Sequence, residues 1–356
     1  MIRKAGASSG KLTERDREIL ARVYEHRFLD TELLWLLLRQ APEEAEAVTG
    51  ADGVSRPRKY GFGLKALYKR LLQLSEARFL QPHQAMPRPV GRGFGGTRTA
   101  YGLGSQSTTT VSEMTGMPVQ LVRDIVEANK VKAPFIQHAL DVARFRVILE
   151  LACRASEGRV RLMFWEQGII LQDWITGEND DGEEVRYSVY PDAFFALEVE
   201  GKGRAHYFLE LDRGTMPIVA KGNRSDIKKK IIGYWLYRKA RRHSQRYRYR
   251  TLPDGAVVGI NVVERERHNE SNDESPDVKS FRVLIVAPGV TEEGGAIGGR
   301  IANIISEFPS FGKQYETSTL FWFASPDSID AEKPETIFER VWLTPNPAHE
   351  LKSLIE

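Results

Sequence analysis

Apolar positions in the first part of the chain recur at helical spacing in three segments. The first follows Thr13, whose hydroxyl is suited to cap a helix with acidic residues in its first turn. The second follows Asp30 or Thr31 and is rich in leucine, and the third runs from about Leu64 to Glu76. Each segment repeats its apolar residues three and four positions apart, which predicts three amphipathic helices.

Two short segments predicted to be strands follow the third helix. One starts at residues 79–80 and the other spans residues 98–103, and a tip rich in Gly, Pro and Arg separates them. Three helices followed by a two-stranded ribbon is the element order of a winged helix-turn-helix. We therefore predict a DNA-binding winged helix over residues 11–104, preceded by a short disordered tail at residues 1–10.

Cationic side chains are concentrated where a winged helix meets DNA. A solvated helix face is the alternative explanation for such a cluster, but the basic tip and the order of the helices together favour DNA binding. The predicted DNA-binding residues of this part are Arg56, Arg58, Lys59, Lys65, Lys69, Arg70, Arg88, Arg92 and Arg98.

A second domain is predicted over residues 134–345. It follows a Ser/Thr-rich linker at 105–133, which contains one short helix, and precedes a tail at 346–356. Its pattern gives a helix, a strand, a hairpin of two strands, a basic helix and a very apolar strand, in that order. The most apolar segment, residues 281–287, is expected to be a buried central strand.

Three carboxylates lie on the predicted hairpin. Asp192 opens its first strand, and Glu210 and Asp212 are two residues apart on the second, so their side chains leave the same face. Carboxylates that meet at the end of a sheet suit Mg²⁺, and the lysines that follow suit phosphate. The alternative is a plain turn at Asp192 and a solvated strand face at Glu210 and Asp212.

A strongly basic segment extends from Lys221 to Arg250. It contains one acid, Asp226, and has tyrosines interleaved among its cations, a pattern typical of nucleic-acid surfaces. A solvated charged face is again the alternative. The predicted phosphate-contacting residues of this segment are Arg241, Arg242, Arg246 and Arg248.

Composition narrows the class of protein. The 356 residues are more than one typical core holds, so two domains are expected, and the net charge is a modest +3. A single cysteine, Cys153, excludes an internal disulfide and a Cys-based zinc site. No apolar run reaches the length of a membrane span, and the first residues lack the apolar core of a signal peptide. A cytoplasmic protein is expected.

The order of the second domain resembles the PD-(D/E)XK restriction-endonuclease-like core. The chain is also similar to the replication-relaxation family, whose members act in plasmid replication or DNA relaxation and include MobC-type relaxases. The likeness is carried by Leu12–Asp16, Pro191-Asp192, Phe208–Thr215 and the Lys-rich helix ending at Tyr234.

The resemblance implies roles for particular residues. Asp192 resembles the first metal-binding acid and Glu210 the second, with Mg²⁺ or Mn²⁺ as cofactor. The nuclease motif has a lysine where this chain has Asp212, and a lysine from the following helix, Lys229 or Lys230, is expected to replace it. His138 and Asp141 resemble a polar pair on the first core helix with no assigned role.

The sequence therefore predicts a two-domain α+β or α/β protein of a plasmid or mobile element that binds double-stranded DNA. Two functions remain open. The first is metal-dependent nicking by Asp192, Glu210 and Asp212 with Lys229 or Lys230. The second is non-catalytic binding by an adaptor whose nuclease fold has decayed. Other proteins of the same mobile element are possible partners in either case.

Overall fold

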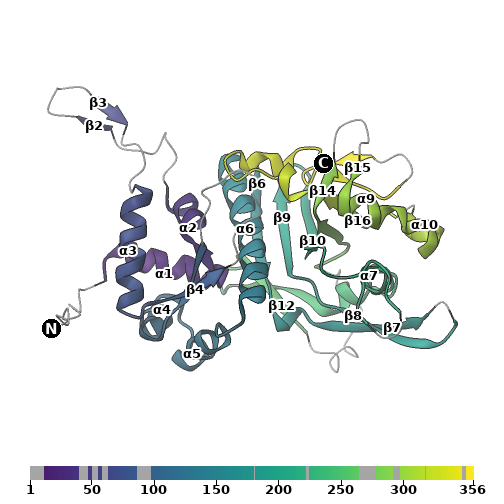
Figure 1. Ribbon diagram of the computed structural model, residues 1–356, viewed down its shortest axis with the longest axis horizontal. Helices are drawn as coiled ribbons and strands as arrows, with labels where there is room; N and C mark the ends of the chain where they lie inside the picture. Colours follow the sequence, from purple (N-terminus) through teal and green to yellow (C-terminus); the bar gives the residue numbers. More distant parts are fainter. Residues whose placement is uncertain are drawn as a thin grey trace. The chain divides into compact units, whose positions relative to one another are not determined.

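The computed structural model describes residues 12–39, 47–49, 55–57, 63–85, 98–179, 181–221, 224–263, 277–291, 297–316, 318–346 and 350–356 (Figure 1). These residues form two compact units, Met1–Val147 and Ile148–Glu356, which divide within one long helix, α6 (Ala133–Ala155). The predicted N-terminal tail at residues 1–10 lies outside the described residues, as do Arg58, Lys59, Arg88 and Arg92.

The first unit begins with the three predicted helices, α1 (Glu14–His26), α2 (Thr31–Leu38) and α3 (Leu64–Glu76). Strands β1 (Leu29–Asp30), β4 (Leu80–Ala85) and β5 (Arg98–Leu103) form an antiparallel sheet in the order β1-β5-β4. Two further short strands, β2 (Ala47–Thr49) and β3 (Ser55–Pro57), pair with each other. The leucines of α2 and the apolar side of α1 are buried, as their spacing predicted.

Helix α1 is fixed at its start by a capping box. The Thr13 hydroxyl accepts the Asp16 N–H, and the Asp16 side chain accepts the Thr13 N–H. Asp16 is almost fully buried and also accepts two bonds from Arg70 of α3, at 2.6 and 2.7 Å. The Arg70 guanidinium therefore joins α3 to the start of α1.

Residues 105–133, predicted as a linker, contain η1 (Ser105–Ser107), α4 (Thr108–Thr115) and α5 (Val119–Ala128). They pack within the first unit. Arg27 donates to the Asn129 side chain at 3.0 Å and to the Ala128 carbonyl at 2.9 Å, and α4 contacts α1. These contacts tie the segment to the end of α1.

The second unit is built on a seven-stranded mixed sheet in the order β18-β17-β16-β13-β10-β9-β6. Its first three strands in the chain form an antiparallel meander, whereas β13 and β16 run parallel to β10. The strands are β6 (Val160–Glu166), β9 (Ala193–Val199), β10 (Gly203–Leu211), β13 (Arg282–Val286), β16 (Phe321–Ala324), β17 (Trp342–Leu343) and β18 (Leu351–Lys352).

The central strands are buried on both faces, which explains their unbroken apolar sequences. Every residue from Ala193 to Leu197 is buried, as is every residue from Val283 to Val286. The C-terminal residues also belong to this sheet, because β18 pairs with β17 and the Leu354 carbonyl accepts the Tyr207 hydroxyl at 2.7 Å.

Helix α7 (Ile227–Lys239) packs on the hairpin of β7 (Asp173–Glu178) and β8 (Glu184–Val189) (Figure 1). Two glycines make the close approach possible. A Cβ at Gly177 would lie 2.4 Å from the Leu236 side chain, and one at Gly233 would lie 3.3 Å from the Ser188 carbonyl. The sequence pattern did not predict this hairpin, because the alternation of its strands is masked by glycines and charges.

The remaining elements surround the sheet. A second hairpin follows the short helix α8 (Arg242–Arg246) and pairs β11 (Tyr247–Thr251) with β12 (Val257–Val262). The others are η2 (Ile169–Leu171), β14 (Gly289–Thr291), β15 (Ile297–Gly298), α9 (Gly299–Ser306), α10 (Phe308–Phe311), α11 (Lys313–Glu316), η4 (Pro326–Ser328) and η5 (Pro334–Phe338).

The predicted α+β class is confirmed, since helices flank a mixed sheet. Among the described helices, none combines the length and the apolar character needed to cross a bilayer.

Adjacent cations on α3 should differ in their effect on stability. We expect Arg70→Ala to lower the free energy of unfolding by about 2 kcal/mol, because it leaves the buried Asp16 carboxylate without its guanidinium. Lys69→Ala removes the same charge from an exposed position and should change stability by less than about 0.5 kcal/mol. Urea denaturation of the two full-length variants measures both effects, and equal losses would contradict this role of Arg70.

Candidate active site

The β9–β10 hairpin brings Asp192 next to the end of β10. Asp192 precedes β9, and its N–H donates to the Leu209 carbonyl at 2.9 Å. Its Oδ2 accepts the Leu211 N–H at 2.7 Å, so the carboxylate lies against the strand that carries Glu210. The antiparallel register, with Ala193 opposite Leu209, sets this arrangement.

Glu210 is a buried carboxylate near the end of β10. Its Oε2 accepts the Lys230 ammonium at 2.5 Å, and its Oε1 accepts the Tyr234 hydroxyl at 2.5 Å. Lys230 and Tyr234 are four residues apart on α7, so one face of the helix supplies both donors. Both oxygens of a buried carboxylate are thereby hydrogen-bonded.

Burial governs the electrostatics of this cluster. It raises the pKa of Glu210, an effect that the nearby Lys230 opposes and the neighbouring Asp192 strengthens. Burial also acts on Lys230, but the carboxylates of Glu210, Asp192 and Asp212 prevail and hold the pKa of Lys230 above its ordinary value. Lys230 is therefore a permanent cation facing three acids at neutral pH.

Asp212 has a different partner from Glu210. It follows β10, and its Oδ2 accepts Arg300 Nε of α9 at 2.7 Å, while its Oδ1 accepts the Gly214 N–H at 2.9 Å. Arg300 also donates to the Met216 carbonyl. Asp212, the residue that departs from the nuclease motif, thus fixes the segment that leaves the sheet.

The sequence left open whether Lys229 or Lys230 lies at Glu210, and the structure shows the contacts of each. Lys230 Nζ lies on Glu210, whereas Lys229 Nζ donates to the Arg224 carbonyl at 2.7 Å. Within the described ranges, no group of three or more His, Cys, Asp or Glu side chains is arranged as a metal site. The donors that suit Mg²⁺ here are the oxygens of Asp192 and Glu210, and a metal site at Asp192, Glu210 and Asp212 stays a prediction.

Tyr234 and Tyr237 are both buried in the core, at 2% and 0% exposure. Burial raises the pKa of each phenol well above its ordinary value. The Tyr234 hydroxyl donates to Glu210 and the Tyr237 hydroxyl donates to Asp173, so both hydroxyls are engaged inside the core. Sequence reasoning did not assign Tyr234 its contact with Glu210, although its position four residues after Lys230 is the signal that indicates a shared face.

Three of the four predicted phosphate-contacting arginines after α7 have partners inside the protein. Arg242 and Arg246 are mostly buried and lie 3.7 and 3.4 Å from the buried carboxylate of Asp173, and Arg246 also donates to two carbonyls before β7. Arg248 donates to the Ser244 and Tyr247 carbonyls, whereas Arg241 is exposed. Cations of this segment therefore hold α8 against β7 as well as facing solvent.

The exposed face of α3 carries Lys65, Tyr68, Lys69 and Leu72, while Arg70 is bound to Asp16. Arg56 lies in β3 and Arg98 begins β5. On α6, His138 is half-buried, and Asp141 Oδ1 accepts the Gln137 side chain at 2.9 Å. The exposed face of α3 thus presents two lysines and a tyrosine ring to solvent.

Comparisons with known proteins identify a family to which the chain is similar. The family model described as replication-relaxation matches residues 20–252, which include the first unit from within α1 onward and the β9–β10 hairpin with α7. No curated protein and no solved structure matches the chain.

Removal of Lys230 should destabilise the protein in a pH-dependent way. We expect Lys230→Ala to lower the free energy of unfolding by about 2 kcal/mol near neutral pH, because Glu210 is left as a buried anion. As the pH falls through the raised pKa of Glu210, the carboxyl takes up a proton, and the deficit relative to wild type should shrink.

Urea denaturation at neutral pH and at about pH 5 tests this expectation. Lys229→Ala is the matched control, since Lys229 contacts a carbonyl and not Glu210. A deficit that is the same at both pH values would contradict the pairing of Lys230 with an ionised Glu210.

Proposed function

Since the chain belongs to the replication-relaxation family, we propose that it is a DNA-binding protein of a plasmid or mobile element whose second unit nicks DNA with the help of a divalent metal. The observation that carries this proposal is the Glu210–Lys230 pair, with Asp192 held against the same strand end. A buried carboxylate, a second carboxylate and a permanent cation are the groups that metal-assisted phosphodiester cleavage requires.

The order of the elements also supports a restriction-endonuclease-like interpretation of the second unit. Helix α6 is followed by the antiparallel β6, β9 and β10, then by α7 and by β13, which is parallel to β10. This is the helix, three strands, helix and strand order expected from the resemblance. The β7–β8 and β11–β12 hairpins are insertions into that order.

The proposed mechanism assigns each residue a task. Asp192 and Glu210 would hold Mg²⁺ or Mn²⁺, which when bound activates the attacking oxygen and neutralises the phosphate. Lys230, kept protonated by the surrounding acids, would move its ammonium from Glu210 toward the charge that develops on the phosphate. Tyr234 would hold Glu210 in place through its buried hydroxyl while Lys230 changes partner.

The first unit supports the proposed DNA binding. Its three helices and three-stranded sheet have the element order of a winged helix, and the exposed face of α3 presents Lys65 and Lys69. In such a fold the third helix enters the major groove, and flanking cations contact phosphates. The proposed ligand is therefore duplex DNA.

A second candidate function is a non-catalytic DNA-binding adaptor. It is favoured by Asp212, which pairs with Arg300 at the position where the nuclease motif has a lysine. It is also favoured by the hydrogen bonds that already occupy both oxygens of Glu210. The two functions share DNA binding and differ only in cleavage.

Nicking of supercoiled plasmid separates them. We expect wild-type protein to nick with Mg²⁺ or Mn²⁺, and Asp192→Asn to lower the rate at least about a hundredfold, because a metal-binding charge is lost. Asparagine retains an oxygen that can accept the Leu211 N–H, so the fold should be kept. DNA affinity should stay equal or rise slightly, since a negative charge that faces phosphate has been removed. Wild-type protein that binds DNA but never nicks it would favour the adaptor.

The α3 face should contribute affinity. We expect Lys65→Gln with Lys69→Gln to weaken binding to all duplex sequences alike and to lower the salt slope by about one unit for each phosphate contact. Fluorescence anisotropy across salt concentrations measures the slope. A matched control, Arg22→Gln with Lys130→Gln, removes two other exposed or half-exposed cations of the same unit. If both pairs had the same effect, α3 would not be the contact helix.

A further inference from the structure

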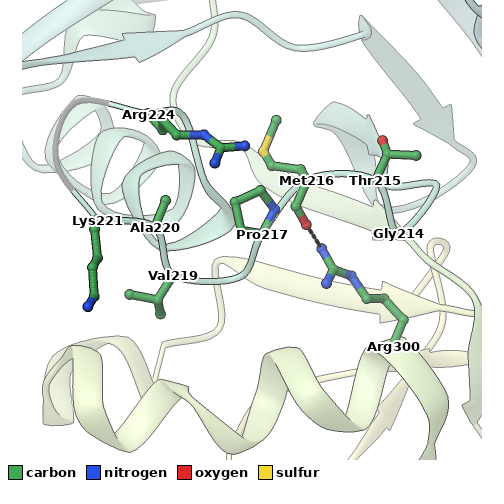
Figure 2. Close-up of a pocket in the computed structure, with 9 residues that line it drawn as sticks. All are labelled: Gly214, Thr215, Met216, Pro217, Val219, Ala220, Lys221, Arg224 and Arg300. Carbon is green, nitrogen blue, oxygen red and sulfur yellow. Dashed lines mark hydrogen bonds between the residues drawn. The ribbon is translucent and has the colours of Figure 1, made fainter.

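An open pocket lies on the segment that joins β10 to α7 (Figure 2). Its volume is about 700 Å³, and it is lined by residues 214–217, 219–221 and 224 together with Arg300 of α9. None of the assigned catalytic residues lines it. The proposed function therefore leaves this pocket without a task.

The lining of the pocket carries positive charge only. Lys221 and Arg224 are exposed and Arg300 is the third cation, whereas no acidic residue is among the lining residues. Two acids lie on the same segment without lining the pocket. Asp212 pairs with Arg300, which leaves Lys221 and Arg224 as the solvent-facing cations, and Asp226 is buried, with its carboxylate accepting the N–H groups of Ala220 and Lys229. The pocket thus suits an anion.

One wall of the pocket is anchored to the carboxylate cluster. Arg300 bonds to Asp212 at 2.7 Å and to the Met216 carbonyl, as Figure 2 shows for the second contact. The carboxylate of Asp212 in turn helps to raise the pKa of Lys230, whose ammonium bonds to Glu210. The pocket and the candidate active site are therefore neighbours, linked through Arg300, Asp212 and Lys230.

Gly214 and Thr215 form a turn at one edge of the pocket. Gly214 has φ 76°, which glycine adopts without strain, and its N–H donates to Asp212 Oδ1 in the tight turn after β10. Thr215 follows with an exposed side chain, whose hydroxyl can donate to an oxygen of a bound group. The turn therefore supplies a neutral donor to the pocket.

We propose that this pocket binds a backbone phosphate of the DNA strand, close to the phosphodiester that meets Asp192 and Glu210. The inference rests on the proposed DNA binding and adds the site that fixes the strand. Two flexible cations, a hydroxyl and an anchored guanidinium match the charge and the several acceptor oxygens of a phosphate. The pocket is larger than one phosphate, so it has room for part of the attached nucleotide.

The first test compares Lys221→Gln with Arg224→Gln against a control, Lys279→Gln with Lys333→Gln. Both double variants remove two exposed cations from the second unit, and only the first pair lines the pocket. With full-length protein and a short fluorescent duplex, we expect about a tenfold loss of affinity for the pocket variant and a salt slope lower by about one unit. The control should stay within about twofold of wild type.

The second test locates the DNA. A photo-crosslinker attached to Thr215→Cys should couple to the duplex, whereas one attached to Ser280→Cys, an exposed position outside the pocket, should not. Burial raises the pKa of Cys153 to about 12, which slows labelling of the native thiol near neutral pH.

The outcomes separate the pocket from the function. The pocket proposal would be overturned if the Lys221→Gln/Arg224→Gln variant bound DNA as tightly as wild type and no crosslink formed at residue 215. That result would leave the proposed DNA binding intact. Wild-type protein that shows no salt-dependent affinity for DNA would overturn the proposed function itself, and the pocket proposal with it.

Discussion

The buried carboxylate of Glu210 is the constraint on which the second unit depends. An ionised carboxylate in the core of a sheet is costly unless charge and hydrogen bonds satisfy it. Lys230 supplies the charge, and Lys230 and Tyr234 each donate a hydrogen bond, from one face of α7. These contacts with Glu210 set the position of the helix on the sheet. Glu210 and Lys230 also belong to the candidate active site, and the requirements of stability and of chemistry therefore coincide there.

Cations elsewhere in the chain serve internal acids in a similar way. Arg70 satisfies Asp16 in the first unit, Arg300 satisfies Asp212 at the end of β10, and two arginines lie near Asp173 beside β7. A basic segment in the sequence is thus a mixture of structural and solvent-facing charges. Only the second kind, such as Lys65 and Lys69, is available for phosphate, which is why net charge alone gives no map of a DNA surface.

The helices of the first unit could be predicted well because their signals are local. Thr13 and Asp30 accept bonds from the first turns they precede, and leucine spacing marks the buried faces. The β7–β8 hairpin and β11 were missed for the opposite reason. The β7–β8 hairpin packs on α7, which is distant from it in sequence, and β11 pairs with β12. The residues of these strands are largely charged, glycine or aromatic, so their own pattern is a weak strand signal.

The sequence by itself determined the α+β class, the central strands, the replication-relaxation family and the choice of Asp192 and Glu210 as candidate acids. Tertiary structure alone decided which lysine meets Glu210, because Lys229 and Lys230 are adjacent in sequence and only the packing of α7 turns one of them toward β10. It also decided the partner of Asp212, since the carboxylate bonds to Arg300 of α9, which is far along the chain. Long-range pairing of charges is a property of packing, and no local pattern encodes it.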